Sequence, residues 1–215
     1  MSLFIHLIKR DLVRSIAGGG LILPVTFFLL VATLYPFAVG PDAGLLGQTG
    51  GGMLWVAALL AALLPVDRLV TPDAESGVFD QLAMRGISEE AIVGAKLIAH
   101  WIGFAIPLMI AAVPASALLR LDMHVLVKLE IGLLLGTPGL AALGMLVASL
   151  TAGLKGASAL SGLLMLPLAI PVLIFGAGSL APVDGGALKL LAAASLLLVA
   201  ITPFAGGAAI RAGRE

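Results

Sequence analysis

The sequence predicts an all-α, polytopic integral membrane protein with six transmembrane helices. Apolar residues make up 60% of the 215 residues and charged residues only 11%, with a mean hydropathy of +1.17. The mean hydropathy lies far above that of soluble domains, and the share of charged residues lies below theirs. The apolar residues also fall in long runs along the whole chain, and about 20 such residues suffice to cross a bilayer as a helix. Because a backbone in lipid must satisfy its own hydrogen bonds, we expect these runs to be helical.

Charge and cysteine content exclude several kinds of protein. The formal net charge is zero, so general attraction to nucleic acid is not expected. The chain contains no Cys, which excludes disulfides, thiol catalysis, thiolate metal sites and covalent haem attachment through cysteine.

The whole chain, residues 1–215, is predicted to be one transmembrane permease domain. In chain order, the predicted transmembrane helices cover residues 19–39, 50–66, 92–119, 125–150, 156–180 and 189–210.

Residues 1–17 are predicted to form an amphipathic helix that lies in the membrane interface. On a helical wheel the apolar side chains share one side: Phe4, Ile8, Leu12 and Ile16. Most basic side chains lie opposite: His6, Lys9, Arg10 and Arg14. The alternative is that this segment is only a basic flank of the first transmembrane helix.

Lysine and arginine give the orientation, because they are enriched in cytoplasmic loops. With the N-terminus inside, nine of them fall on the cytoplasmic side: Lys9, Arg10, Arg14, Arg68, Arg85, Lys96, Lys155, Arg211 and Arg214. Three fall outside: Arg120, Lys128 and Lys189. Both termini and the polar segment 67–91 are therefore predicted to be cytoplasmic.

Few ionisable residues lie within the predicted transmembrane helices. Lys96, His100, Lys128 and Glu130 are near helix ends, where we expect them to reach an interface by snorkelling. No acidic residue occupies a clear mid-membrane position, which disfavours a proton-driven or sodium-driven transporter.

The three histidines, His6, His100 and His124, are not spaced as a metal site, and their expected roles are structural or interfacial. His124 is the most suitable of them for contact with haem, because it lies on the predicted outer face. Trp55, Trp101 and Tyr35 are expected to anchor helix ends at the membrane surface.

The polar segment 67–91 is predicted to contain two short helices. Thr71 reads as an N-cap, with Pro72 in the first turn, and Gly77 ends or interrupts that helix. A second helix follows, and Ser88 marks the start of the next transmembrane helix. In the second helix, Val78, Phe79 and Leu82 share one side, whereas Asp80, Gln81 and Arg85 point elsewhere.

This amphipathic segment is acidic, whereas helices that bind lipid surfaces are normally basic. A soluble protein partner is therefore favoured. The chain has no Gly-rich phosphate-binding loop of the Walker type, so ATP hydrolysis is expected on a separate subunit. No nucleophile–base pair or metal set indicates an enzyme. These features fit the membrane half of an ATP-driven transporter.

The segment also resembles the coupling-helix signature of type-2 ABC exporter permeases. The matching residues are ESGVFDQL at 75–82, ISEE at 87–90 and GAK at 94–96. The whole chain resembles the haem exporter protein B family, the permeases of the bacterial cytochrome c maturation system. The other matching pieces are FFLL (27–30), YPF (35–37), GP (40–41), WVAALL (55–60), AHW (99–101), LLLGTP (133–138), GLK (153–155), LPLAIP (166–171), PVDG (182–185) and TPFA (202–205).

The resemblance implies a multi-pass protein of the bacterial inner membrane that works in an assembly. The implied partners are a cytoplasmic ABC ATPase, a second copy of this chain, a haem-handling membrane protein, a small single-span protein and the periplasmic haem chaperone. ATP and haem would be handled by those partners, so no cofactor is expected on this chain. ATP hydrolysis would be linked to haem delivery and release of the haem-loaded chaperone.

The resemblance also implies the residues that couple the chain to its ATPase: Asp67, Arg68, Asp73, Glu75, Gly77, Phe79, Asp80, Gln81 and Leu82. Phe79 and Leu82 are expected to fill a groove on the ATPase, and the carboxylates to set the orientation. Family members often have Asp at position 76 and Glu at position 80, where this chain has Ser76 and Asp80. Two alternatives stay open, a permease for another apolar substrate and a membrane scaffold without a transport path.

Overall fold

The computed structural model describes residues 2–20, 22–154, 157–181 and 185–213, and within them every regular element is a helix. Six helices in these ranges are long and apolar enough to cross a membrane, which confirms the predicted fold class. They are α2 (Ile22–Val39), α3 (Ala43–Leu63), α6 (Glu89–Leu118), α7 (Met123–Thr151), α8 (Ala157–Gly178) and α9 (Ala187–Ala212). Helix α6 continues through Pro107, and helix α7 continues through Pro138.

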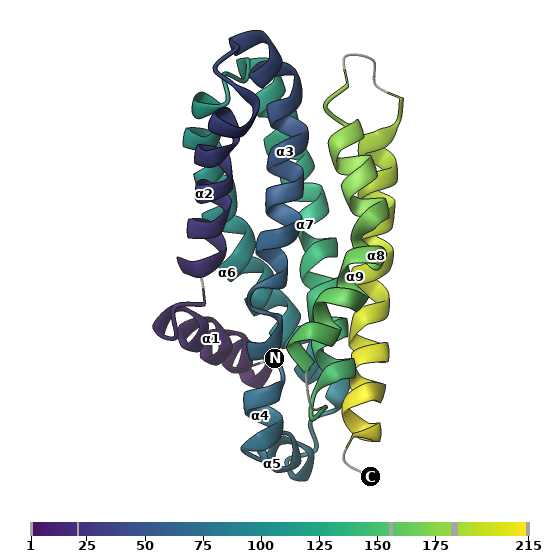
Figure 1. The fold of residues 1–215 in the computed structure, drawn as a ribbon. Helices are drawn as coiled ribbons and strands as arrows, with labels where there is room; N and C mark the ends of the chain where they lie inside the picture. The colour runs from purple at the N-terminus through teal and green to yellow at the C-terminus, as the bar shows by residue number, and fades with distance from the viewer. Residues whose placement is uncertain (1, 21, 155–156, 182–184, 214–215) are drawn as a thin grey trace.

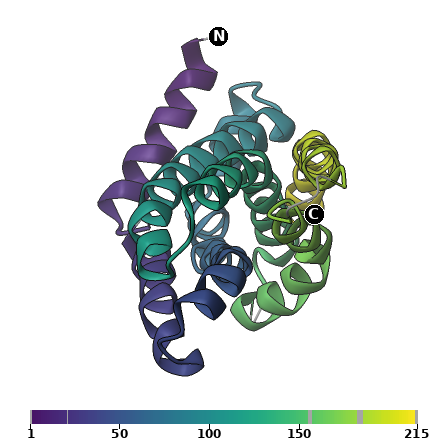
Figure 2. The same cartoon turned by 90° about the horizontal axis from the view of Figure 1, so that it is seen from above.

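Four shorter helices complete the described structure: α1 (Ser2–Ala17), the 3-10 helix η1 (Val66–Arg68), α4 (Thr71–Glu75) and α5 (Val78–Met84). Helix α1 lies across the direction of the long helices and packs on α6 (Figure 1). Helices α4 and α5 and the C-terminal end of α9 lie at this same end of the bundle (Figure 1). Seen along the bundle, α1 and α9 lie on opposite flanks (Figure 2). The helix expected over 1–17 is therefore present.

Helix α7 occupies the centre of the bundle, where it packs against α3, α6, α8 and α9. Small residues allow this close packing. A Cβ atom added at Gly136 of α7 would lie 2.7 Å from the indole of Trp55, and one at Gly176 of α8 would lie equally close. Trp55 itself is fully buried on α3, so the expectation that it anchors a helix end at the membrane surface is wrong.

The other two aromatic residues expected in a membrane belt also make internal contacts. The indole nitrogen of Trp101 donates to Thr137 Oγ1 at 3.2 Å, which links α6 to α7. The hydroxyl of Tyr35 donates to Thr49 Oγ1 at 2.9 Å, which links α2 to α3. Hydrogen bonds between helices thus account for the positions of these polar groups.

Helix α3 begins seven residues before the start expected at residue 50. Asp42 caps it, because its side chain accepts a hydrogen bond from the Leu45 backbone at 2.9 Å. The first turns contain Gly and polar residues and so read as a loop. In the structure, the glycines bring neighbouring segments close, and a Cβ at Gly51 would lie 2.6 Å from Leu180.

Candidate functional site

The segment between α3 and α6 folds into a helical hairpin made of α4 and α5, which we call the α4–α5 hairpin. Gly77 joins the two helices with a left-handed backbone (φ 67°), a conformation that favours glycine. Pro72 stands in the first turn of α4 as expected, but Thr71 is the first helical residue and not the N-cap. Ser88 caps α6 as expected, accepting from the Ala91 backbone at 3.3 Å.

The apolar side of the hairpin faces the rest of the chain. Phe79 and Leu82 are only 3% and 8% exposed and belong to the main apolar core, and Val78 packs against it. The two buried side chains therefore hold the hairpin on the bundle. This corrects the expectation that they project into a groove on a partner, because their apolar surface is already covered within this chain.

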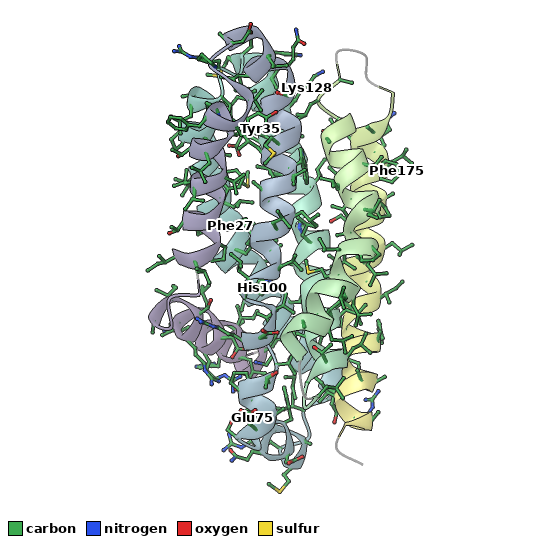
Figure 3. The ribbon with its side chains drawn as sticks, in the orientation of Figure 1. Phe27, Tyr35, Glu75, His100, Lys128 and Phe175 are labelled. Atoms are coloured by element: carbon green, nitrogen blue, oxygen red, sulfur yellow. The ribbon has the colours of Figure 1, made fainter. Side chains whose placement is uncertain are left out.

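The opposite side of the hairpin is open to solvent. Its exposed residues include Glu75, Asp80, Gln81, Met84 and Arg85. Met84 is 82% exposed, and Figure 3 shows Glu75 at this same end of the molecule. Sequence reasoning missed Met84. The available signal was its position two residues after Leu82, away from the side that carries Phe79 and Leu82.

Asp67 and Arg68 lie on η1, at the base of the hairpin, and both are exposed. Arg68 Nη1 donates to the carbonyl oxygen of Gly18 at 3.4 Å, which connects η1 to the end of α1.

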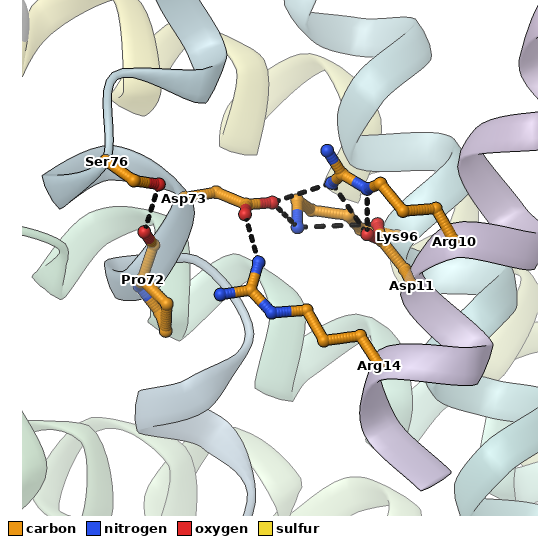
Figure 4. Close-up of polar contacts among 7 residues, drawn as sticks. All are labelled: Arg10, Asp11, Arg14, Pro72, Asp73, Ser76 and Lys96. Atoms are coloured by element: carbon orange, nitrogen blue, oxygen red, sulfur yellow. Dashed lines mark hydrogen bonds and ion pairs between the residues drawn. The ribbon is translucent and has the colours of Figure 1, made fainter. Parts of the chain in front are cut away.

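Asp73 lies in a group of charges that joins α1, α4 and α6, and within this group Asp73 and Lys96 are buried (Figure 4). We call it the Asp73 cluster, and its members are Arg10, Asp11, Arg14, Asp73 and Lys96. Asp73 Oδ2 pairs with Arg10 Nη2 at 2.8 Å and with Lys96 Nζ, while Oδ1 accepts from Arg14 Nη1. The Asp73 side chain is only 1% exposed, so it faces the interior of the chain.

Opposite charges lie next to one another in this cluster. Burial would lower the pKa of Arg10, but Asp11 and Asp73 more than offset this and hold that pKa above its ordinary value. Lys96 pairs with Asp73 and lies 3.4 Å from Asp11, and its Nζ is 5.9 Å from the centre of the Phe79 ring. Lys96 is thus paired internally and does not snorkel to an interface as expected.

A second set of charges connects the ends of two long helices. Arg211 of α9 pairs with Glu89 at 3.1 Å and with Glu90 at 2.6 Å, both in the first turn of α6. A groove of about 250 Å³ lies nearby, between the hairpin and the ends of α7 and α9. Its rim carries Glu75 and Asp80, and its floor includes Phe79 and Ile210.

The three histidines differ in how exposed they are. His6 and His124 are exposed, whereas His100 is 7% exposed and stacks on Phe104 with ring centres 5.9 Å apart. Among the described residues, no three His, Asp or Glu side chains are grouped so as to hold a metal ion.

The chain is similar in sequence to proteins of one family over nearly its whole length. The sequence profile of the CcmB protein family matches residues 2–213. A protein of Rhodobacter capsulatus named heme exporter protein B is 46% identical over 211 residues, which is 95% of this chain and 97% of that protein. Proteins of the same name from Bradyrhizobium diazoefficiens and Escherichia coli K12 are 42% and 40% identical. These cover 97% and 87% of this chain, and 97% and 88% of their own lengths. The chain therefore belongs to the CcmB protein family.

Proposed function

We propose that this chain is the membrane-spanning permease subunit of an ABC transporter that serves cytochrome c maturation. Its relatives over nearly the full length are named heme exporter protein B, and its six transmembrane helices suit a permease. Because the sequence has no Walker-type phosphate loop, ATP hydrolysis belongs to a separate ATPase subunit. In this proposal, ATP hydrolysis is coupled to haem delivery and to release of a haem-loaded chaperone.

The observation that carries the proposal is the α4–α5 hairpin. It protrudes at one end of the bundle, with a solvent-exposed face on one side and the Asp73 cluster on the other (Figures 1 and 4). A partner that pushes on the exposed face moves α4. Through Asp73, that movement acts on Arg10 of α1 and on Lys96 of α6. The hairpin thereby joins an external contact surface to a transmembrane helix.

The residues expected to couple the chain to its ATPase divide into two groups in this mechanism. Glu75, Asp80 and Gln81, together with Met84, form the contact face, and Asp67 and Arg68 flank its base. The others act from within the chain: Asp73, Gly77, Phe79 and Leu82. Gly77 sets the turn, Phe79 and Leu82 fix the hairpin, and Asp73 transmits its movement.

The remaining features of the assembly follow from the same proposal. The chain spans the inner membrane of a bacterium. The end that carries the hairpin faces the cytoplasm, because the soluble ATPase and its ATP are there. A second copy of the chain, a haem-handling membrane protein, a small single-span protein and a periplasmic chaperone complete the assembly. Haem and ATP are held by those partners.

The test is capture of partners by the tagged protein. We would purify the chain gently in detergent and identify associated proteins by mass spectrometry, comparing wild type with Met84→Asp and Gln81→Ala. Met123→Asp is the matched control, because Met123 is 75% exposed at the other end of the bundle, at the start of α7. We expect an ABC ATPase and a haem-bearing membrane protein with wild type and control, and much less ATPase with Met84→Asp.

The other outcomes separate the alternatives. Recovery of the ATPase without a haem-bearing protein supports a permease for another apolar substrate. Absence of any ATPase, even after crosslinking, supports a scaffold and contradicts the proposal. Equal ATPase recovery from Met84→Asp and wild type contradicts the assignment of the contact face.

A further inference from the structure

A cavity of about 220 Å³ lies beside the turn that connects α1 to α2. Three parts of the chain line it. Helix α1 and the turn after it contribute Asp11, Arg14, Ser15, Gly18 and Gly20, and α6 contributes Lys96, Ala99 and His100. The segment from Pro65 to Asp73 closes it from a third side, with Arg68 at its edge.

The cavity carries an excess of positive charge. Its lining contains three cations (Arg14, Arg68, Lys96) and two carboxylates (Asp11, Asp73), so the formal charge of the lining is +1. Arg10 lies outside the lining and adds a further positive charge through its pair with Asp73. Lys96 is nine-tenths buried and already paired with Asp73, so the excess positive charge of the lining lies on the arginines. A ligand that neutralises this site must be an anion.

Two arginines at the cavity have donors to spare. Within the described residues, the side chain of Arg14 makes one hydrogen bond, to Asp73, and that of Arg68 makes one, to Gly18 O. A guanidinium has five N–H donors in a planar fork, which suits two oxygens of a phosphate. Ser15 adds a hydroxyl group beside them.

The surroundings of the cavity are apolar on one side. A smaller hollow shares Gly20, Pro65 and Arg68 with it and continues along Leu23 and Pro24 of α2. Helix α2 is the first transmembrane helix, and its first residues, Ile22 and Leu23, are 68% and 47% exposed. The cationic site thus lies beside apolar surface at the end of a transmembrane helix, which is the level of lipid headgroups.

We propose that this cavity binds the phosphate of an anionic membrane phospholipid. Arg14 and Arg68 donate to the phosphate oxygens, Lys96 lies behind them in the wall, and an acyl chain follows the exposed side chains of Ile22 and Leu23. Basic pockets of this kind at the ends of transmembrane helices suit anionic headgroups. The bound lipid bridges α1 and η1, and it steadies Arg14, which also holds Asp73 of the α4–α5 hairpin.

The test is lipid retention by the purified chain. Native mass spectrometry in detergent would compare added phosphatidylglycerol and phosphatidylcholine with the same acyl chains, for wild type, Arg68→Gln and Arg14→Gln. Arg68 is exposed and makes one long hydrogen bond, so Arg68→Gln should fold normally. Arg85→Gln is the matched control, since Arg85 is an exposed arginine outside the cavity lining.

We expect wild type and Arg85→Gln to prefer phosphatidylglycerol, and Arg68→Gln to bind it about tenfold more weakly because a charged hydrogen-bond donor is lost. Equal retention of both lipids by wild type, or unchanged binding by both Arg68→Gln and Arg14→Gln, would overturn the proposal. Addition of inorganic phosphate distinguishes the source of the phosphate. Phosphatidylglycerol that stays bound supports a lipid site, whereas its displacement by millimolar inorganic phosphate would assign the cavity to a soluble anion.

Discussion

The carboxylate of Asp73 on α4 pairs with the ammonium group of Lys96 on α6, and the two side chains are only 1% and 8% exposed. This pair connects the α4–α5 hairpin to a transmembrane helix. It is not isolated, because Arg10 and Arg14 bring α1 to the same carboxylate. The carboxylate of Asp73, on α4, is therefore the group that contacts both α1 and α6.

Loss of the Asp73 charge should destabilise the protein more than loss of Lys96. Asp73→Asn leaves Lys96 buried with only Asp11 nearby, at 3.4 Å, and we expect a loss of about 3 kcal/mol in the free energy of unfolding. Lys96→Met should cost less, because Asp73 keeps Arg10 and Arg14. Unfolding of both variants in detergent would measure the difference. A larger loss for Lys96→Met would contradict the central place given to Asp73.

Replacement of Gly77 should strain the hairpin. An alanine there must adopt the left-handed backbone that glycine holds at φ 67°, which costs about 1 kcal/mol. We expect faster amide exchange in α4 and α5 of Gly77→Ala, measured by hydrogen–deuterium exchange. Gly162→Ala on α8 is the control, because no atom lies within 4 Å of its added Cβ and its backbone is not left-handed. Identical exchange in wild type and Gly77→Ala would refute the strain.

Added volume near Trp55 should be poorly tolerated. The Cβ of Gly176→Ala meets three indole atoms at 2.7 Å, and overpacking of this kind costs about 1–3 kcal/mol. Gly52→Ala on α3 has open space and should behave like wild type. The double variant Gly176→Ala/Trp55→Phe should regain part of the lost stability, since the smaller ring leaves room. Thermal unfolding of the four proteins checks this, and no recovery in the double variant would point to another cause.

The pairs made by Arg211 should matter much less than the Asp73 cluster. The Arg211 side chain is 47% exposed, so water screens its attraction to Glu89 and Glu90. We expect Arg211→Gln to unfold at the same temperature as wild type, at both low and high salt. A clear, salt-sensitive loss of stability would show that this pair holds α9 to α6.

The six transmembrane helices could be predicted from the sequence because hydropathy acts over some twenty residues and outweighs local irregularities. The start of α3 was harder to place. Gly44, Gly47 and Gln48 resemble a loop, and only the cap at Asp42 marks the true beginning. Such glycines are explained by close neighbours such as Leu180, which no local pattern reveals.

The helical hairpin could be predicted from the sequence, but the burial of Asp73 within the chain could not. Gly77 and the two sides of α5 follow from local rules, and the structure confirms both. The burial of Asp73 depends on Arg10 and Lys96, which are distant in sequence and meet only in the fold. The available signal was Lys96, a cation within a transmembrane helix that needs a partner.

The Asp73 cluster also has a consequence for biogenesis. The ribosome synthesises the helices that carry it in chain order, with α1 first, α4 later and α6 last. Before Lys96 is synthesised, Asp73 lacks its most buried counter-ion. Helix α1 likewise lacks its packing contacts with α6. Insertion of α6 is thus the step that allows α1, α4 and α6 to form their contacts with one another.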